Sequence, residues 1–275
     1  MKQQKDRINT VLTIFCIIVI LFIIAPLIIV VVNSFNAASY NVFPLKGFSI
    51  QWYEKMAGYS KFLTGAKNSI ITGLCAVGLG LLIGIPASYA LARGNMPGKN
   101  LVKSFIMLPL ALPKIVLGLA MYIYFVQLDL YNTITGLSLC HTLLVLPYIV
   151  VMVTSAIKNI ERQQEEAAMD LGAKPFTAFS RILVPQIAIA VTLAAALGFI
   201  VSFDQVEASL LLVRSTNYTL PIEMMIYMEK YQDPTIAALS TVLLTAVIGI
   251  LAILILALRK KGDVVKILAS SQKKE

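Results

Sequence analysis

The sequence predicts an all-α integral membrane protein with six transmembrane helices and short interfacial helices. Hydrophobic residues form 58% of the 275 residues and charged residues only 13%, whereas about 25% of the residues of a soluble domain are charged. The apolar residues gather in six runs, each close to the roughly 20 residues that cross a bilayer. The net charge of +9 comes from basic residues in the connections, which is typical of membrane topology and argues against nucleic acid as a partner.

The first apolar run, residues 11–32, follows Lys2, Lys5 and Arg7. A charged start before an apolar run is also typical of a signal peptide. This run is longer than the apolar part of a signal peptide, and Asn33-Ser34-Phe35 after it is a weak cleavage site. We therefore interpret residues 1–66 as an uncleaved membrane helix followed by an external loop.

The second run, residues 69–92, carries a small residue at every fourth position. On a helix this spacing places the small residues in one stripe, formed by Ala76, Gly80, Gly84, Ser88 and Ala92. Such stripes let membrane helices approach closely, although simple tolerance of glycine in lipid would also explain it. We expect a packing surface rather than a chemical site.

The third run, residues 105–126, contains Pro109 and Pro113 four residues apart. Each removes a backbone donor, so we expect a kink or a break. Irregular backbone at membrane depth is tolerated where it is buried in protein or lines a cavity. Lys114 follows directly, roughly 14 Å along the helix from residue 105 at about 1.5 Å per residue. A lysine near mid-membrane indicates a functional charge in a substrate pathway, or else a side chain that snorkels or pairs with a carboxylate.

The remaining runs are residues 136–157, 187–203 and 235–258. The sole histidine, His141, has no second metal ligand in sight, so we interpret it as a hydrogen-bonded polar residue. The cysteines lie inside apolar runs without metal spacing; they are Cys16, Cys75 and Cys140. We therefore predict no catalytic residue, no metal site and no cofactor.

Two carboxylates, Asp204 and Glu207, follow the fifth run. Their spacing of three residues predicts that they share one helical face. They favour a cationic substrate, whereas Lys114 favours an anion such as a phosphonate. The charge of the substrate therefore stays open at this point.

A polar loop separates the fourth run from the fifth and includes Glu165, Glu166, Ala167, Ala168, Met169, Asp170, Leu171 and Gly172. Good helix formers predict a short surface helix there, and Gly172 is placed to end it. Pro175 prevents simple continuation, and Pro185 suits the opening of the next helix. We expect a short helix, a turn and then the start of a membrane helix.

The loop resembles the EAA loop of permease subunits of binding-protein-dependent ABC importers. The matching pattern is Glu166-Ala167-Ala168, three residues, Gly172, nine residues, Ile182, one residue, and Val184-Pro185. Val184 replaces a leucine of the family pattern, which is a conservative apolar change. Because the spacing extends over about twenty residues, a chance match is less probable than for a short motif. The alternative is an ordinary amphipathic connection between helices.

The resemblance implies a MetI-like type I importer fold with a cytoplasmic coupling helix between membrane helices 4 and 5. The permease domain would comprise residues 67–261, followed by a cytoplasmic tail, 262–275. Glu166 and Asp170 would anchor the loop through charge pairs, and Gly172 would form the sharp turn. The coupling residues implied by the resemblance are Glu165, Glu166, Ala167, Ala168, Asp170, Gly172 and Pro185.

The implied partners are two cytoplasmic ABC ATPases, a second related permease, an extracytoplasmic substrate-binding protein and the lipid bilayer. The sequence has no GxxxxGK[ST] phosphate loop, so we expect ATP hydrolysis by the partners and no enzyme activity of this chain. With both termini in the cytoplasm, most lysines and arginines fall in cytoplasmic loops. We expect a bacterial inner-membrane location with this orientation.

Residues 108–113, 202–205 and 219–221 resemble the polyamine-type permeases, a group that also includes importers of iron(III) and phosphonates. We therefore expect a polyamine, spermidine or putrescine, to pass along a pathway containing Lys114, Asp204 and Glu207. The alternatives are an anion such as an aminophosphonate, or iron(III). An ion-coupled secondary transporter could use the same charges, and a structural membrane scaffold would leave them and the loop unexplained.

Overall fold

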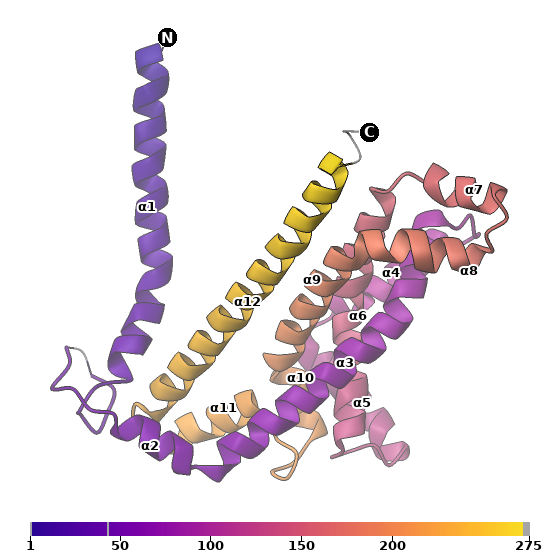
Figure 1. Ribbon diagram of the computed structural model, residues 1–275. Helices are drawn as coiled ribbons and strands as arrows, with labels where there is room; N and C mark the ends of the chain where they lie inside the picture. The colour runs from indigo at the N-terminus through magenta and orange to yellow at the C-terminus, as the bar shows by residue number, and fades with distance from the viewer. Residues whose placement is uncertain (1, 43, 272–275) are drawn as a thin grey trace. The chain divides into compact units, whose positions relative to one another are not determined.

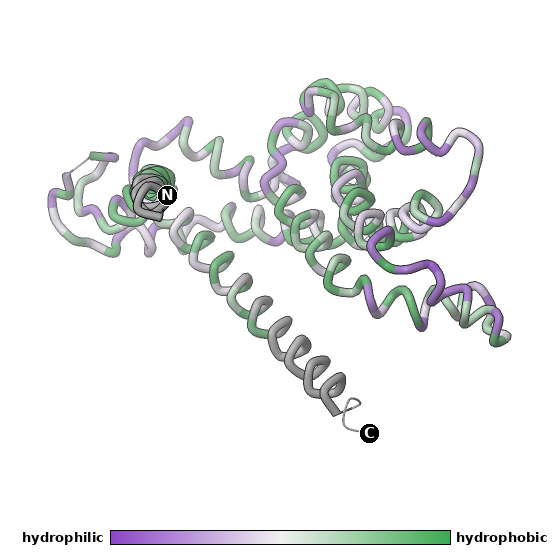
Figure 2. The backbone as a smooth tube through the Cα atoms, turned by 90° about the horizontal axis from the view of Figure 1, so that it is seen from above, coloured by the Kyte–Doolittle hydropathy of each residue, from purple (hydrophilic) through white to green (hydrophobic). Residues whose placement is uncertain are grey.

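The computed structural model describes residues 2–42 and 44–271. Regular structure in these residues is helical, apart from one isolated bridge between Asn36 and Phe48, which confirms the predicted all-α class. Where Figure 2 shows hydropathy, the long helices are largely hydrophobic, and hydrophilic residues concentrate in the connections and the short helices. The chain divides into two units, one of residues 1–60 and 226–275 and the other of residues 61–225.

The first unit contains three helices, α1 (Lys2–Asn33), α2 (Gln51–Gly58) and α12 (Thr235–Ser271) (Figure 1). Trp52 of α2 is buried, and its Nε1 donates a hydrogen bond of 2.6 Å to the backbone oxygen of Asn36 in the connection between α1 and α2. Lys55 Nζ lies 2.6 Å from Asp233 Oδ2. Helix α11 (Leu220–Lys230) crosses the boundary between the units. These contacts give the connections of the first unit a defined structure.

The second unit is built around α6 (Ile134–Lys158), which packs along α9 (Val184–Phe203). The other elements are α3 (Ser60–Arg93), α4 (Lys99–Ala111), α5 (Lys114–Gln127), α7 (Gln163–Asp170), α8 (Pro175–Ala178), the π-helical segment η1 (Phe179–Leu183) and α10 (Glu207–Leu212). Eight buried side chains from α3, α6, η1 and α9 form its apolar core: Val77, Val145, Ile149, Val153, Ile157, Leu183, Ile187 and Ala194.

The stripe of small residues on α3 faces α6. A Cβ atom added to Gly80 or Gly84 would lie 2.8 Å from a side-chain carbon of Ile149. Ser88 Oγ donates to the backbone oxygen of Val150 at 3.3 Å. Only small residues permit this approach, so the stripe is a packing surface.

The third apolar run breaks at its prolines. Helix α4 ends at Ala111, α5 begins at Lys114, and the two are bent by 104°. Pro113 is the N-cap residue of α5 and cannot donate the hydrogen bond that would continue α4. The predicted break is therefore confirmed.

Four helices of the described residues are long and apolar enough to cross a membrane, and the bent pair of α4 and α5 makes five. The four are Leu12–Asn33, Ser60–Arg93, Ile134–Lys158 and Pro175–Phe203. The apolar stretch Thr235–Ile250 of α12 is shorter. The chain is therefore a multi-pass membrane protein by composition and helix length.

Candidate functional site

The polar loop contains the predicted short helix, α7, which ends as its sequence indicates. Gly172 has φ +91°, a left-handed conformation that favours glycine. Its N–H donates to the Met169 oxygen at 2.9 Å, and the Ala173 N–H donates to the Ala168 oxygen at 2.9 Å. This pair of bonds is a Schellman motif, which satisfies the last carbonyl groups of the helix.

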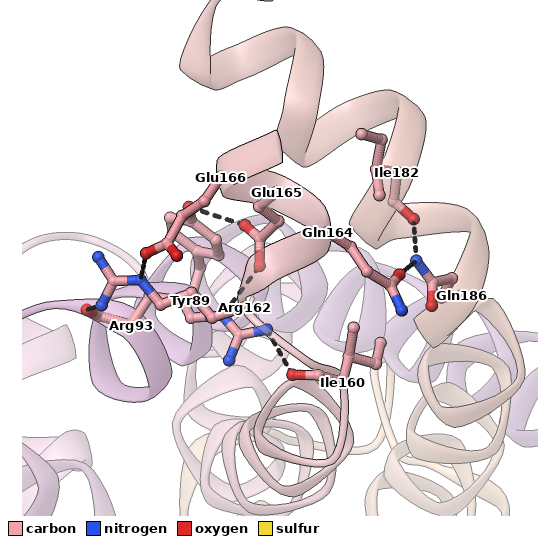
Figure 3. A network of polar contacts seen from close by, with 9 residues as sticks. All are labelled: Tyr89, Arg93, Ile160, Arg162, Gln164, Glu165, Glu166, Ile182 and Gln186. Carbon is pink, nitrogen blue, oxygen red and sulfur yellow. Dashed lines mark hydrogen bonds and ion pairs between the residues drawn. The ribbon is translucent and has the colours of Figure 1, made fainter. Parts of the chain in front are cut away.

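Glu165 anchors α7 to the last turns of α3 (Figure 3). Its side chain is 4% exposed and accepts a bond of 2.9 Å from Arg93 Nε and one of 3.1 Å from Tyr89 Oη. Arg93 Nη2 also donates to the Ile160 oxygen at 2.8 Å. Because a buried charge is costly unless it is paired and hydrogen-bonded, this network holds α7 in one position.

Glu166 and Asp170 lie on the outside of the loop. Glu166 pairs with Arg162 at 2.8 Å, four residues earlier in the same stretch, and both side chains are about half exposed. Within the described residues, Asp170 has no cationic side chain within 4.0 Å. Of these three carboxylates, only Glu165 forms an ion pair with another helix in the part of the chain that the structure describes.

The loop also exposes apolar side chains. Leu171 is 91% exposed and Phe176 is 77% exposed, and Ala167 and Ala168 on α7 are small. Beside them, Gln186 Nε2 donates to Gln164 Oε1 at 2.8 Å, which connects α7 to α9. Leu171 is the C-cap residue of α7, and Phe176 lies on α8, so the exposed apolar side chains lie on both sides of the turn at Gly172.

The chain is helical from Pro175, well before Pro185. Pro175 opens α8, the π-helical segment follows, and Pro185 lies in the first turn of α9. The Val184 N–H donates to the Phe179 oxygen, five residues back. Pro185 thus lies in the first turn of α9, but the helix does not open there as the sequence predicts, because Pro175–Phe203 is helical without a break. The wider π turn lets the helix continue into a residue that cannot donate.

The second candidate site joins α5 to α10. Gly118 approaches α10 so closely that an added Cβ would lie 2.7 Å from the Ala208 Cα. This contact places Lys114 Nζ 3.8 Å from Glu207 Oε2, with the side chains 45% and 60% exposed. At this distance and exposure the pair is weak. The sequence left open whether Lys114 pairs with a carboxylate. In the structure its partner is Glu207.

The prediction that Asp204 and Glu207 share one helical face is wrong. Helix α9 ends at Phe203, Asp204 is its C-cap residue, and α10 begins only at Glu207. Between them the chain turns and Gln205 becomes buried, with its Nε2 3.4 Å from Glu207 Oε2. Among the described residues, Gln205 Oε1 has no hydrogen-bond partner. Both carboxylates remain exposed.

His141 is the hydrogen-bonded polar residue that the sequence predicts. It is 1% exposed, its Nδ1 lies 2.7 Å from Ser202 Oγ, and its Nε2 lies 2.7 Å from Ser209 Oγ. It thereby connects α6 to the ends of α9 and α10. This places a structural polar cluster beside the turn that carries Asp204 and Glu207.

The model of the binding-protein-dependent transport system inner membrane component matches residues 76–261. The chain belongs to this family. It is thus an ABC transporter permease of the MetI type, and the MetI-like fold that the sequence implies is confirmed.

Two curated relatives match this permease over most of its length and of their own. The spermidine/putrescine transport system permease protein PotC of Escherichia coli (strain K12) is 29% identical over 223 residues, 81% of this chain and 84% of PotC. The putrescine transport system permease protein PotI of the same strain is 28% identical, over 87% of this chain and 88% of PotI.

A solved structure shares the fold. It is the crystal structure of a bacterial ABC transporter involved in the import of the acidic polysaccharide alginate, with a TM-score of 0.69 and 17% identity. The similarity covers 90% of this permease and 95% of that chain. At this identity it supports the architecture alone.

The sequence does not predict the two residues that hold Glu165 in this permease, Arg93 and Tyr89. Arg93 precedes Glu165 by 72 residues, and it lies in a basic turn whose charge fits topology equally well. No local pattern connects the two residues. Their relationship follows from the packing of α7 against α3.

Proposed function

We propose that this permease forms half of the pathway through which an ATP-driven importer moves a polyamine such as spermidine or putrescine. The observation that carries the proposal is the similarity to PotC and PotI over most of all three chains. The importer would contain two cytoplasmic ABC ATPases, a second related permease and an extracytoplasmic binding protein. This chain would supply six membrane helices, with both termini in the cytoplasm.

In this proposal the permease domain is residues 67–261, after an N-terminal helix and external loop, 1–66. The cytoplasmic tail would be residues 262–275, of which 272–275 lie outside the described residues. The sixth membrane helix would be α12, whose apolar stretch begins at Thr235. These boundaries follow from the apolar runs and the basic connections.

We assign coupling to the loop from Glu165 to Pro185. Its exposed tip, Leu171 and Phe176, would contact the ATPase, and burial of such side chains stabilises association. The buried Glu165 would transmit ATPase movement to α3 through Arg93, because a fixed contact moves as one body. Alternating access of this kind requires two packings of the helices rather than a catalytic residue.

The substrate pathway would pass the break between α4 and α5. There the exposed carboxylates of Asp204 and Glu207 attract an ammonium group, and the neighbouring Lys114 offsets part of that attraction. In this proposal the opposite charges of Lys114 and Glu207 lie next to each other on the pathway. An anion such as an aminophosphonate is the second candidate, favoured by the exposed Lys114.

The deciding experiment is uptake into vesicles that contain this chain, its ATPase and the other transporter subunits. Labelled spermidine and putrescine are compared with an aminophosphonate and iron(III), with and without ATP. We expect ATP-dependent polyamine uptake that Glu166→Lys abolishes. Uptake of the aminophosphonate or iron(III) alone would refute the polyamine assignment, and uptake by this chain without an ATPase would refute the importer class.

A further inference from the structure

A basic pocket lies within the second unit, where the last turns of α3 and α6 meet the first turns of α4. Its volume is about 270 Å³. It is lined by three lysines, three uncharged polar residues and four apolar residues: Lys99, Lys103, Lys158, Asn100, Thr154, Ser155, Leu91, Met107, Val150 and Val151. The pocket is separate from the polar loop and from the Lys114–Glu207 pair.

Among the residues that the structure describes, no carboxylate neutralises the positive charge of this pocket. No acidic residue lines it. Lys99 Nζ donates to the Gly94 oxygen at 2.9 Å, and in residues 2–42 and 44–271 no carboxylate lies within 4.0 Å of Lys103 or Lys158. Three ammonium groups around one cavity create a field that attracts an anion.

Two further features indicate an anionic ligand. Helix α4 has 13 residues and its N-cap, Gly98, provides no side-chain hydrogen bond, so the first N–H groups of the helix add positive potential beside the lysines. Thr154 Oγ1 is buried and has no hydrogen-bond partner among the described residues. A buried hydroxyl without a partner is uncommon, and a ligand oxygen in the pocket would satisfy it.

The apolar residues of the pocket indicate that the ligand has an apolar part as well as a negative charge. Met107, Val150 and Val151 line the pocket, and Leu101 and Phe105 on the same helix as Met107 are each 76% exposed. The pocket lies at the ends of two membrane-spanning helices, α3 and α6, where lipid headgroups meet the protein. A soluble anion would use the lysines but not this apolar surface.

We propose that the pocket binds the headgroup phosphate of an anionic phospholipid, with the acyl chains along the apolar surface of α4. The lysines face the phosphate, the Thr154 hydroxyl donates to one of its oxygens, and Met107 contacts the start of a chain. Basic pockets between membrane helices select anionic headgroups in this way. The site would make the packing of α4 against α6 dependent on lipid charge.

The test measures lipid binding to the full chain, purified in detergent and stripped of lipid, by native mass spectrometry. We expect phosphatidylglycerol to bind more tightly than phosphatidylcholine. The double variant Lys103→Gln/Lys158→Gln should weaken phosphatidylglycerol binding roughly twentyfold, because each lysine contributes about fivefold at a membrane surface. The matched control, Lys61→Gln/Lys67→Gln at the other end of α3, removes the same charge and should bind like the wild type.

A second variant, Val151→Trp, reduces the cavity without changing charge and should also weaken binding of phosphatidylglycerol. This keeps the test decisive if the double lysine variant folds poorly. Equal affinity of the wild type for the two lipids would overturn the proposal, as would an equal loss in the control. Displacement of phosphatidylglycerol by millimolar inorganic phosphate would show that the pocket takes a soluble anion instead.

Discussion

Arg93 Nε lies 2.9 Å from Glu165 Oε1, and both side chains are almost wholly buried, at 11% and 4% exposure. This pair joins the end of a membrane helix to the short helix of the polar loop. Breaking a buried pair leaves one uncompensated charge, which costs about 3 kcal/mol or more. The pair therefore provides the most direct test of how the loop is held.

We expect Glu165→Gln to lower the unfolding midpoint by about 6–12 °C, since about 3 kcal/mol corresponds to that shift in a chain of this size. The matched change Glu166→Gln removes an exposed pair and should cost below about 1 kcal/mol. The measurement is thermal unfolding in detergent. Equal shifts for the two variants would show that Glu165 does not anchor α7.

Replacing Gly172 by alanine and replacing Gly78 by alanine should change the stability in opposite directions. Gly172 and Gly78 both have open space around an added Cβ, but only Gly172 has a positive φ. Gly172→Ala should destabilise by about 1 kcal/mol, whereas Gly78→Ala in the middle of α3 should stabilise by about 0.5 kcal/mol.

Thermal unfolding of both glycine variants, followed by ATPase-coupled uptake, checks this prediction. We expect Gly172→Val to impair coupled uptake more than Gly172→Ala, because a β-branched residue tolerates positive φ least. Normal uptake by Gly172→Val would contradict a role of this turn in coupling.

The Lys55–Asp233 pair of the first unit predicts a pH dependence. Burial alone would raise the pKa of Asp233, but hydrogen bonds from Lys55 and Thr235 outweigh it and hold that pKa below its ordinary value. The hydrogen bond to Asp233 raises the pKa of Lys55. Stability from Asp233 is therefore full above about pH 4 and lost as the pH falls below its folded-state pKa. The stability that Lys55 contributes is full below about pH 10 and is lost as the pH rises above its folded-state pKa.

Trp52 reports on this pair because it is the only tryptophan, and Lys55 Nζ lies 5.6 Å from its ring. Its fluorescence should stay constant between about pH 5 and pH 9 and change outside that range. Asp233→Asn should remove the acid-side transition and cost about 1 kcal/mol, a modest value because Lys55 is half exposed. An unchanged acid transition in that variant would assign it to another carboxylate.

The Lys114–Glu207 pair gives opposite expectations for the two candidate substrates. For a polyamine, Glu207→Gln should raise the KM severalfold, and Lys114→Gln should lower it, because removing Lys114 exposes the carboxylate. For an anion both directions reverse. Glu229→Gln, an exposed carboxylate on α11, is the charge-matched control. Unchanged KM values in both variants would remove this pair from the pathway.

Local signals in the sequence predicted much of the loop and of the broken helix. A glycine that ends a helix and prolines that interrupt or open one act through their own backbone, so Gly172, Pro113 and Pro175 could be interpreted without the fold. The apolar runs likewise located the long helices. Each of these signals depends only on residues that are close together in the sequence.

Relationships between distant residues could not be predicted in the same way. The Lys114–Glu207 distance depends on how closely α5 meets α10 at Gly118, and no periodicity reveals that contact. The assumption that Asp204 and Glu207 share a helix failed because Gln205, a polar residue, is buried at a turn. Tertiary packing decided both cases.

The π-helical segment Phe179–Leu183 makes the orientation of α8 depend on the number of residues in this part of the chain. A π turn contains one residue more than an α turn, and each residue of an α-helix advances it by about 100°. Deleting any one residue of this segment would restore an α-helix and rotate α8, with the exposed Phe176, by that angle about the axis of α9. The direction in which the ring of Phe176 points therefore depends on the number of residues between Gly172 and Pro185. It depends less on which residues they are.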